Sequence, residues 1–197
     1  PEDAELLLVS GEARTLTRLA RGLAPGAASA PMAAKGAEQA GLWRWRKSLL
    51  YRLRALPGPQ SAPGLINDLG VPPERVDELL QRVRTLAAER AIPIPVYGHA
   101  GSGNLHFRPI LVDTGQKTVS RFLDFCDASA RAALELGGTV CGEHGMGPLR
   151  NRFLEAEWHH GMSARLRQIA EAMDPAGTFA RTGIETASRD MVEQALR

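Results

Sequence analysis

Two short stretches of the chain gather side chains that could bind a metal ion or move a proton. The first, residues 97–106, places His99 and His106 on either side of a glycine-rich turn. The second, a few tens of residues later, places Glu143 directly beside His144 between glycines. Three of the five histidines of the chain lie in these two stretches. We therefore expect the chemistry of the protein to be concentrated where they meet.

A divalent metal is the first chemistry that these residue types indicate. Neutral imidazole is a common ligand of such metals, and a nearby carboxylate adds an anionic ligand. Two histidines and one carboxylate leave coordination positions open for a substrate. The spacing is not that of a zinc finger or a His-Glu-x-x-His helix, so two alternatives stay open. The histidines can be structural, or the glycines can cradle a phosphate, although no Gly-Lys-Ser/Thr follows them.

Strands are predicted on both sides of the first turn. Residues 91–97 and 105–112 have apolar, β-branched character, and the glycines between them let the chain reverse. In the second strand, Leu105 and Phe107 alternate with His106 and Arg108. Successive side chains of a strand point to opposite faces. His106 is therefore expected on an open face, opposite the apolar pair.

Helices and further strands complete an α+β pattern. A short strand at 139–141 is expected to deliver the Glu143–His144 pair. Other extended segments are predicted at 5–10 and 65–71, and amphipathic periodicity predicts helices at residues 12–23, 41–56, 72–87, 118–136, 149–160 and 163–173. This order predicts an antiparallel sheet with helices packed on one face, followed by C-terminal helices.

Size and composition limit the class of protein. The 197 residues suit one large domain, and a net charge of +2 gives no reason to expect nucleic-acid binding. Two cysteines do not make a disulfide framework, and they are expected to be buried thiols in a reducing compartment. No apolar run approaches the length of a membrane span. We expect a cytoplasmic protein, with peripheral attachment to the inner membrane as a further option, and a C-terminal piece of a longer polypeptide.

A family resemblance appears at the two stretches already singled out. Gly-His-Ala-Gly-Ser-Gly-Asn-Leu-His at 98–106 and Gly-Thr-Val-Cys-Gly-Glu-His-Gly-Met-Gly at 138–147 closely resemble the C-terminal domain of the FAD-linked oxidases. That family includes D-lactate dehydrogenases, D-2-hydroxyglutarate dehydrogenase and the flavin subunit of glycolate oxidase. Asp-Pro-Ala-Gly at 174–177 and Leu-Trp-Arg-Trp-Arg at 42–46 resemble two further family motifs. The matches run in order over residues 5–184.

The resemblance implies a domain organisation and a cofactor. It implies a ferredoxin-like cap and substrate domain over residues 1–184, followed by a polar tail at 185–197. FAD would be held mainly by an N-terminal FAD-binding domain, which is absent from this sequence and would lie in the same polypeptide or in a separate subunit. No residue of this chain is assigned to the flavin.

The resemblance also assigns roles to single residues. His144 matches the family's general base, a role that suits a group with a pKa near working pH. Arg46 matches an arginine that grips the substrate carboxylate, for which a planar guanidinium offers a two-point fit. Asn104 is expected to contact the substrate or to buttress the turn or a ligand. The family's ligands for a divalent metal (Zn, Fe or Mn) are matched by His99, His106 and Glu143.

Three positions depart from the family pattern. Ser102 stands where the family usually has Asp, which implies a weaker metal site. Residues 180–183 replace the closing Asn-Pro-Gly-Lys, which removes an expected contact with the flavin edge. Ile66 stands where some relatives carry a lysine for the substrate, which favours a small substrate over one with a second carboxylate.

These inferences lead to one main hypothesis and two alternatives. The main hypothesis is the C-terminal domain of a FAD-dependent dehydrogenase or oxidase of 2-hydroxy acids, of the D-lactate or glycolate type. It oxidises the hydroxyl to a keto group with hydride transfer to flavin, and this chain alone is expected to be inactive. The electron acceptor is left open, and a homodimer is considered. The first alternative is a stand-alone or vestigial cap that binds a metal or hydroxy acid without redox chemistry. The second, ranked last, is a metal-dependent hydrolase.

Overall fold

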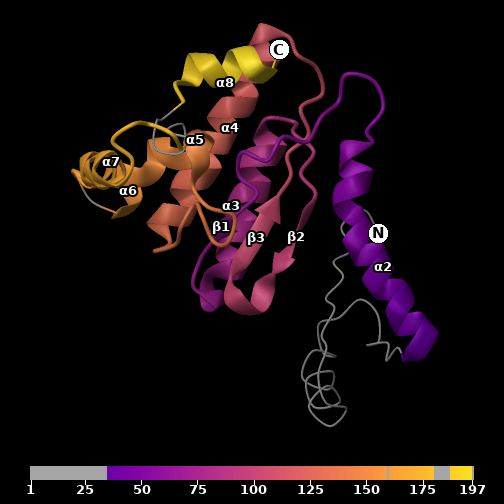
Figure 1. Ribbon diagram of the computed structural model, residues 1–197. Helices are drawn as coiled ribbons and strands as arrows, with labels where there is room; N and C mark the ends of the chain where they lie inside the picture. Colours follow the sequence, from indigo (N-terminus) through magenta and orange to yellow (C-terminus); the bar gives the residue numbers. More distant parts are fainter. Residues whose placement is uncertain (1–34, 159, 180–186, 197) are drawn as a thin grey trace. The chain divides into compact units, whose positions relative to one another are not determined.

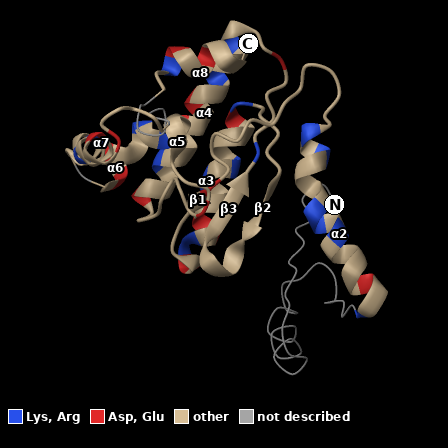
Figure 2. Cartoon of the chain, viewed as in Figure 1, with Lys and Arg blue, Asp and Glu red and all other residues tan. Residues whose placement is uncertain are grey.

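The computed structural model describes residues 35–158, 160–179 and 187–196. The chain divides into two compact units, residues 1–50 and 51–197. Helix α2 (Gly36–Arg54) belongs mainly to the first unit, has no buried residue, and carries four arginines and one lysine from Arg44 onward (Figure 2). It confirms the helix predicted at 41–56 and begins earlier. The strand predicted at 5–10 and the helix at 12–23 lie outside the described residues.

The second unit is built on a small antiparallel sheet. Its strands are β1 (Leu69–Gly70), β2 (Val96–His99) and β3 (Asn104–Phe107), in the order β1-β3-β2. Within the sheet, Tyr97 pairs with His106, and Leu69 pairs with Leu105. A single antiparallel bridge joins Gly70 to Thr139 on the other side of β1. The expected α+β class with an antiparallel sheet is therefore found.

Two amphipathic helices, α3 (Val76–Glu89) and α4 (Gln116–Glu135), lie together behind the sheet (Figure 1). A 3-10 turn at Pro73–Arg75 leads into α3, as the proline pair predicted. Apolar faces at the predicted helical spacing meet Leu105 and Phe107 of β3 in the core. The buried apolar residues of the two helices are Val76, Leu79, Val83, Ala87, Val119, Phe122, Leu123, Phe125, Cys126, Ala130, Ala132 and Ala133. This core fixes the sheet on which the site is mounted.

The strands are shorter than predicted because prolines flank them. Pro93, Pro95 and Pro109 have no N–H to donate to a ladder. The pairing nevertheless continues past β3, since Arg108 N donates to Pro95 O and Ile110 N donates to Pro93 O, each over 2.9 Å. The strand predicted at 139–141 is reduced to the bridge at Thr139.

Short helices form the C-terminal part of the described chain. They are α5 (Gly147–Arg150), a 3-10 turn (Asn151–Phe153), α6 (Leu154–Trp158), α7 (Met162–Met173) and α8 (Arg189–Leu196). Gly161 has a φ of 89° and separates α6 from α7, as the sequence predicted. Helix α8 packs on α4 through buried Val192. Among the described helices, none is long and apolar enough to cross a membrane.

Candidate metal and proton-transfer site

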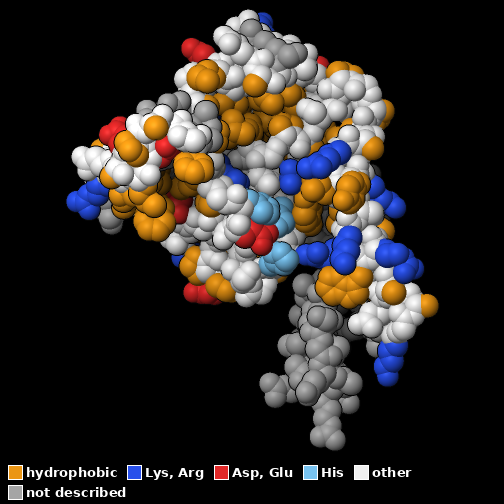
Figure 3. Space-filling view, in the orientation of Figure 1, with side chains coloured by type: hydrophobic (Ala, Val, Ile, Leu, Met, Phe, Trp, Pro, Cys, Tyr) orange, Lys and Arg blue, Asp and Glu red, His pale blue; other side chains and the backbone are white. Residues whose placement is uncertain are grey.

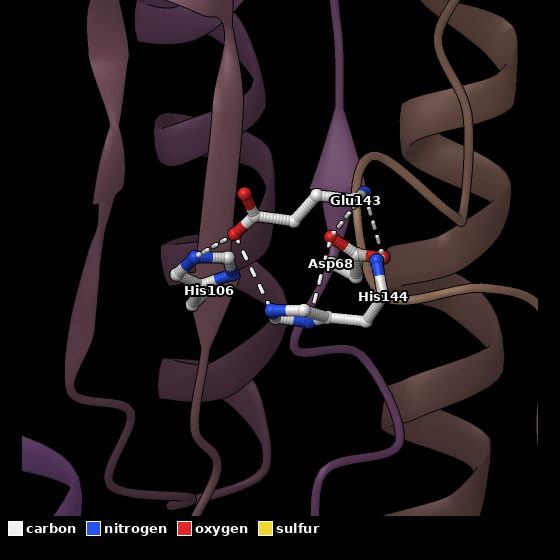
Figure 4. Close-up of side chains that lie close together, drawn as sticks. All are labelled: Asp68, His106, Glu143 and His144. Atoms are coloured by element: carbon white, nitrogen blue, oxygen red, sulfur yellow. Dashed lines mark hydrogen bonds and ion pairs between the residues drawn. The ribbon is translucent and has the colours of Figure 1, made fainter.

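Polar side chains from three separate segments meet on one face of the sheet, over its central strand β3 and the neighbouring β1 (Figure 4). Asp68 comes from the residue before β1, His106 from β3, and Glu143 and His144 from the loop that follows α4. One ligand atom from each of these four residues lies within 4.8 Å of the others. In the space-filling view, histidine side chains border acidic atoms at the surface (Figure 3). The structure thus brings together the two stretches that the sequence singled out.

Glu143 stands at the centre of this arrangement. Its Oε1 lies 3.0 Å from His106 Nε2, 3.3 Å from His144 Nε2 and 3.7 Å from His99 Nε2. We call these four residues the His–Glu cluster. The side chains of His99, Glu143 and His144 are 41–49% exposed, whereas that of His106 is 6% exposed. The cluster therefore has one buried histidine, His106, on its inner side and an open outer side.

His106 does not lie on an open face as the sequence analysis expected. The residue is 5% exposed because the segment before β1 and the Glu143 loop fold over its strand. Its Nδ1 lies 2.5 Å from the carbonyl oxygen of Asn67. Burial is the main cause that lowers the pKa of His106 below its ordinary value, although the Asn67 carbonyl and Glu143 oppose the shift. The ring is therefore neutral near pH 7.

The proton on His106 can be assigned from this contact. A carbonyl oxygen only accepts hydrogen bonds, so Nδ1 carries the proton and Nε2 of the neutral ring presents a lone pair. That lone pair faces the carboxylate oxygen of Glu143 at 3.0 Å. Two electron-rich atoms at this distance repel each other unless a cation binds them. The donor set of imidazole nitrogens and a carboxylate fits a divalent metal, and the carbonyl of Asn67 fixes the orientation of the His106 ring.

Backbone geometry holds the first turn, residues 98–106. Gly103 has a φ of +75°, and a Cβ on it would lie 1.8 Å from the carbonyl oxygen of Val71. A Cβ on Gly98 would lie 2.4 Å from the carbonyl oxygen of Asn104. Only glycine allows such close approach. These two glycines fix the backbone of the turn, so that His99 and His106 project from paired strands toward Glu143.

Asp68 is the main residue that the sequence analysis missed. It is fully buried and accepts hydrogen bonds from the backbone N–H of Glu143 at 3.1 Å and of His144 at 2.9 Å. Its Oδ1 also lies 3.7 Å from His144 Nδ1. A carboxylate that accepts several N–H groups is a strong anchor. Asp68 thus ties the second loop, residues 142–147, to the start of β1.

Arg150 is the second missed residue. Its guanidinium donates to the carbonyls of Gly145 and Met146 and to Oδ1 of Asn67, and it lies 3.7 Å from Asp68 Oδ2. The residue is 9% exposed. It therefore closes the second loop from the opposite end. A polar Asn-Asp pair inside the apolar run 65–71 was the one signal that could have led to this anchor.

Asn104 lies under the site. Its Nδ2 donates to Asp68 Oδ1 at 3.3 Å, and a Cβ on Gly142 would lie 2.7 Å from Asn104 Cγ. The Oδ1 of Asn104 is buried and has no donor among the residues that the structure describes. Asn104 therefore packs between Asp68 and the second loop, with one acceptor that no described residue fills. Its expected roles, contact with the substrate or support of the turn or of a ligand, stay predictions.

Arg46 belongs to the other compact unit. It lies on α2, half-buried, with its guanidinium 5.7 Å from the centre of the Trp43 ring. Its role as the carboxylate-binding arginine stays a prediction.

This chain is similar in sequence to several known proteins. A D-lactate dehydrogenase from Archaeoglobus fulgidus is 35% identical over 55% of this chain, which covers 24% of that protein. The glycolate oxidase subunit GlcD of Bacillus subtilis is 29% identical over 56% of the chain and 24% of that protein. A D-2-hydroxyglutarate dehydrogenase from Haemophilus influenzae is 28% identical over 68% of the chain and 13% of that protein. The chain therefore spans about a quarter or less of each of these relatives.

The family profile of the FAD linked oxidases, C-terminal domain, matches residues 10–183. That range includes both glycine-rich stretches, Asp68 and Arg150. The chain therefore belongs to the family of FAD linked oxidase C-terminal domains.

Proposed function

We propose that this chain is the substrate-binding domain of a FAD-dependent oxidoreductase that oxidises small 2-hydroxy acids, of the D-lactate or glycolate type. The observation that carries the proposal is the convergence of His99, His106 and His144 on one oxygen of Glu143. The names of the relatives, which act on D-lactate, glycolate or D-2-hydroxyglutarate, support the substrate class.

The proposal assigns His99, His106 and Glu143 to a divalent metal such as zinc, iron or manganese. When bound, the metal supplies Lewis acidity that lowers the pKa of a hydroxyl group. His106 contributes a neutral ring whose Nε2 lone pair is directed at the cluster. Glu143 contributes the negative charge that offsets part of the cation's charge.

His144 is the proposed general base. Its Nε2 is on the cluster side, 3.3 Å from Glu143 Oε1, and its Nδ1 lies 3.7 Å from the buried Asp68 carboxylate. When the ring takes up the hydroxyl proton, the nearby carboxylate stabilises the resulting imidazolium. FAD, when bound, would accept the hydride that leaves the carbon bearing this hydroxyl group.

Asn104 and Arg46 are the proposed substrate contacts. For Asn104 the support is its place beneath the cluster, where its Nδ2 donates to Asp68 Oδ1 at 3.3 Å. For Arg46 the support is its place in the Leu-Trp-x-x-Arg motif.

A flavin-bearing partner completes the proposal. The outer side of the cluster is open, since three of its four side chains are 41–49% exposed. A FAD-binding domain in the same polypeptide or in a separate subunit would cover that side and exclude water from it. The relatives, which are about four or more times longer than the matched segment, support such a domain.

The ferredoxin-like arrangement is also part of the proposal. The order β1-α3-β2-β3-α4, followed by a bridge from Thr139 back to β1, follows the β-α-β-β-α-β pattern of that fold. The neighbours β2, β3, β1 and Thr139 are antiparallel throughout. A solved structure in which 139–141 forms a full strand beside β1 would complete it.

Metal content and flavin reduction test the function together. The purified chain is expected to contain about one zinc, iron or manganese ion per molecule by elemental mass spectrometry, and His99→Ala and His106→Ala are expected to lose it. His160→Ala is the matched control, because His160 is exposed and outside the cluster. Full metal content in both cluster variants would refute the ligand assignment.

His144→Asn tests the base in a protein that contains the FAD domain. It is expected to retain the metal and to lose reduction of flavin by D-lactate or glycolate, measured by bleaching of the flavin absorbance. Unchanged reduction would refute the base. Metal and hydroxy-acid binding without any flavin reduction in the unmodified protein would favour the binding-module alternative.

A further inference from the structure

Arg108 is a buried arginine that none of the roles above uses. It follows Asn104 and His106 at every second position of β3 and its continuation, so the three side chains share one face. The hydrogen bond from Arg108 N to Pro95 O, 2.9 Å long, keeps this register beyond the end of the strand. The residue is 9% exposed. Its position is therefore fixed beside His106, the buried residue of the cluster.

The guanidinium of Arg108 has few partners. Its Nε donates to the hydroxyl of Tyr97 at 3.2 Å. Among the described residues no carboxylate forms an ion pair with it. Arg150, which is equally buried, contrasts with it, because Arg150 faces Asp68 and donates to two backbone carbonyls. Arg152, another shielded arginine, is paired with Asp127 at 2.5 Å.

An unpaired buried charge is costly. Taking an ion out of water is repaid only if an opposite charge and hydrogen-bond acceptors meet it inside the protein. Arginine cannot lose its proton to avoid that cost. Within the described part of the chain, the guanidinium of Arg108 has one hydrogen-bond partner, a neutral tyrosine, and it is therefore poised to bind an anion.

Two sets of contacts place Arg108 next to the cluster. A Cβ on Gly64 would lie 3.0 Å from Arg108 Nη1 and 3.2 Å from Asn67 Oδ1, so both atoms border the same small space. Asn67 in turn contacts the rings of His106 and His144. On the other side, the ring of Tyr97 meets that of His106 edge-on, with centroids 5.2 Å apart. Asn67 and Tyr97 thus separate Arg108 from the proposed base His144 and the proposed metal ligand His106.

We infer that Arg108 binds a carboxylate group of the substrate, next to the His–Glu cluster, with Tyr97 as a positioning residue that orients the guanidinium. The inference rests on the proposed function for the identity of the anion. A guanidinium offers two parallel N–H groups to a carboxylate, and here the residue that carries it is only 9% exposed. Arg108 lies in the same compact unit as the cluster, whereas Arg46 lies in the other unit. A substrate with a second carboxylate is therefore again a candidate. The sequence alone disfavoured such a substrate, because Ile66 stands where some relatives carry a lysine.

Equilibrium binding to the flavin-free chain tests the inference without depending on redox chemistry. The probes are sodium D-lactate and D-2-hydroxyglutarate, with (R)-1,2-propanediol as the counterpart of D-lactate that lacks a carboxylate. Saturation-transfer NMR and calorimetry would compare the unmodified chain with Arg108→Met and with Arg131→Met, a control at an exposed arginine on α4. Metal content is measured on every sample.

Arg108→Met is expected to weaken carboxylate binding at least about tenfold, with unchanged metal content, while Arg131→Met binds as the unmodified chain does. Weakening for both acids assigns Arg108 to the carboxylate next to the hydroxyl. Weakening for D-2-hydroxyglutarate alone assigns it to the second carboxylate. Tyr97→Phe is expected to weaken binding by a few-fold, because it removes only the acceptor that orients Nε.

Equal affinity of Arg108→Met and the unmodified chain for both acids would overturn the inference, and so would an unmodified chain that binds neither acid. If Arg108→Met does not fold, Arg108→Lys carries the test. It is expected to bind at least about threefold more weakly, since an ammonium lacks the two-point fit, and unchanged affinity would overturn the inference. Arg108-dependent binding without flavin reduction in the FAD-containing protein would refute the proposed function and leave the anion site standing. Flavin reduction that is insensitive to Arg108→Met would refute the anion site and leave the proposed function standing.

Discussion

The two halves of the site are held in different ways. The first turn, residues 98–106, is fixed by its backbone, through strand pairing and through glycines that leave no room for a Cβ. The second loop, residues 142–147, has no strand to hold it and is fixed by side chains from elsewhere, above all Asp68 and Arg150. The turn carries its geometry in its own sequence. The geometry of the loop depends on residues that are distant in the sequence. Backbone substitutions should therefore disrupt the first turn, and substitutions of the anchoring side chains should disrupt the second loop.

Gly103→Ala should have the largest effect on stability, because it alters the first turn, which is held by its backbone. Alanine would have to keep a φ of +75° and place its Cβ 1.8 Å from Val71 O, so the turn and the Val71 segment must separate. We expect a loss of about 3 kcal/mol in the free energy of unfolding, measured by urea denaturation. Gly101→Ala is the control, since nothing lies within 4 Å of its Cβ position. Equal stability of the two variants would show that the turn is not held by its backbone.

Asp68→Asn should come next and should strike the loop. The substitution keeps the shape of the side chain but removes the charge that accepts the N–H groups of Glu143 and His144. We expect a loss of about 2 kcal/mol in unfolding free energy, together with weakened metal binding. Asp113→Asn is the control. Asp113 also accepts hydrogen bonds, from Gly115 and Thr118, but in an exposed turn. Similar losses in both variants would contradict a special role for the buried carboxylate.

Arg150→Met should have a smaller effect of the same kind. It removes the donors to Gly145, Met146 and Asn67 and keeps most of the apolar bulk of the side chain. We expect a loss of about 1–2 kcal/mol in unfolding free energy. Arg82→Met is the comparison, because Arg82 makes ion pairs at the surface, where such pairs contribute about 0–1 kcal/mol. An Arg150 variant as stable as the Arg82 variant would mean that the loop does not depend on this anchor.

Ser102→Asp should have the smallest effect on stability. It tests whether a side chain in the first turn changes the affinity of the site for a metal. Ser102 is exposed, and its Oγ donates to His99 O at 3.1 Å. We expect unfolding free energy to change by no more than about 0.5 kcal/mol. Metal affinity, measured by competition with a chelator, is expected to rise because the family's usual carboxylate is restored beside His99. An unchanged affinity would show that Ser102 is not the reason for a weak site.

The difference between the two halves also explains what the sequence could predict. Glycines around histidines are visible in a linear sequence, and helical periodicity located α3, α4 and α7 well. Asp68 and Arg150 gave no such pattern, because their roles depend on contacts between residues that are far apart in the sequence. Asp68 lies 75 positions from Glu143, and Arg150 lies 83 positions from Asn67. The burial of His106 was missed for the same reason. Alternation on a strand tells which side a residue faces, but not what folds over that side.

The anchoring of the second loop has a consequence for how a ligand meets the site. The side chains of Glu143 and His144 are 41% and 43% exposed, yet their amide hydrogens point into the fully buried Asp68 carboxylate. These two amides should exchange with deuterium slowly, as core amides do, although they sit beneath the open surface. A ligand that arrives there finds a backbone that is already ordered. It has only side-chain rotation to restrict, so binding loses little conformational entropy.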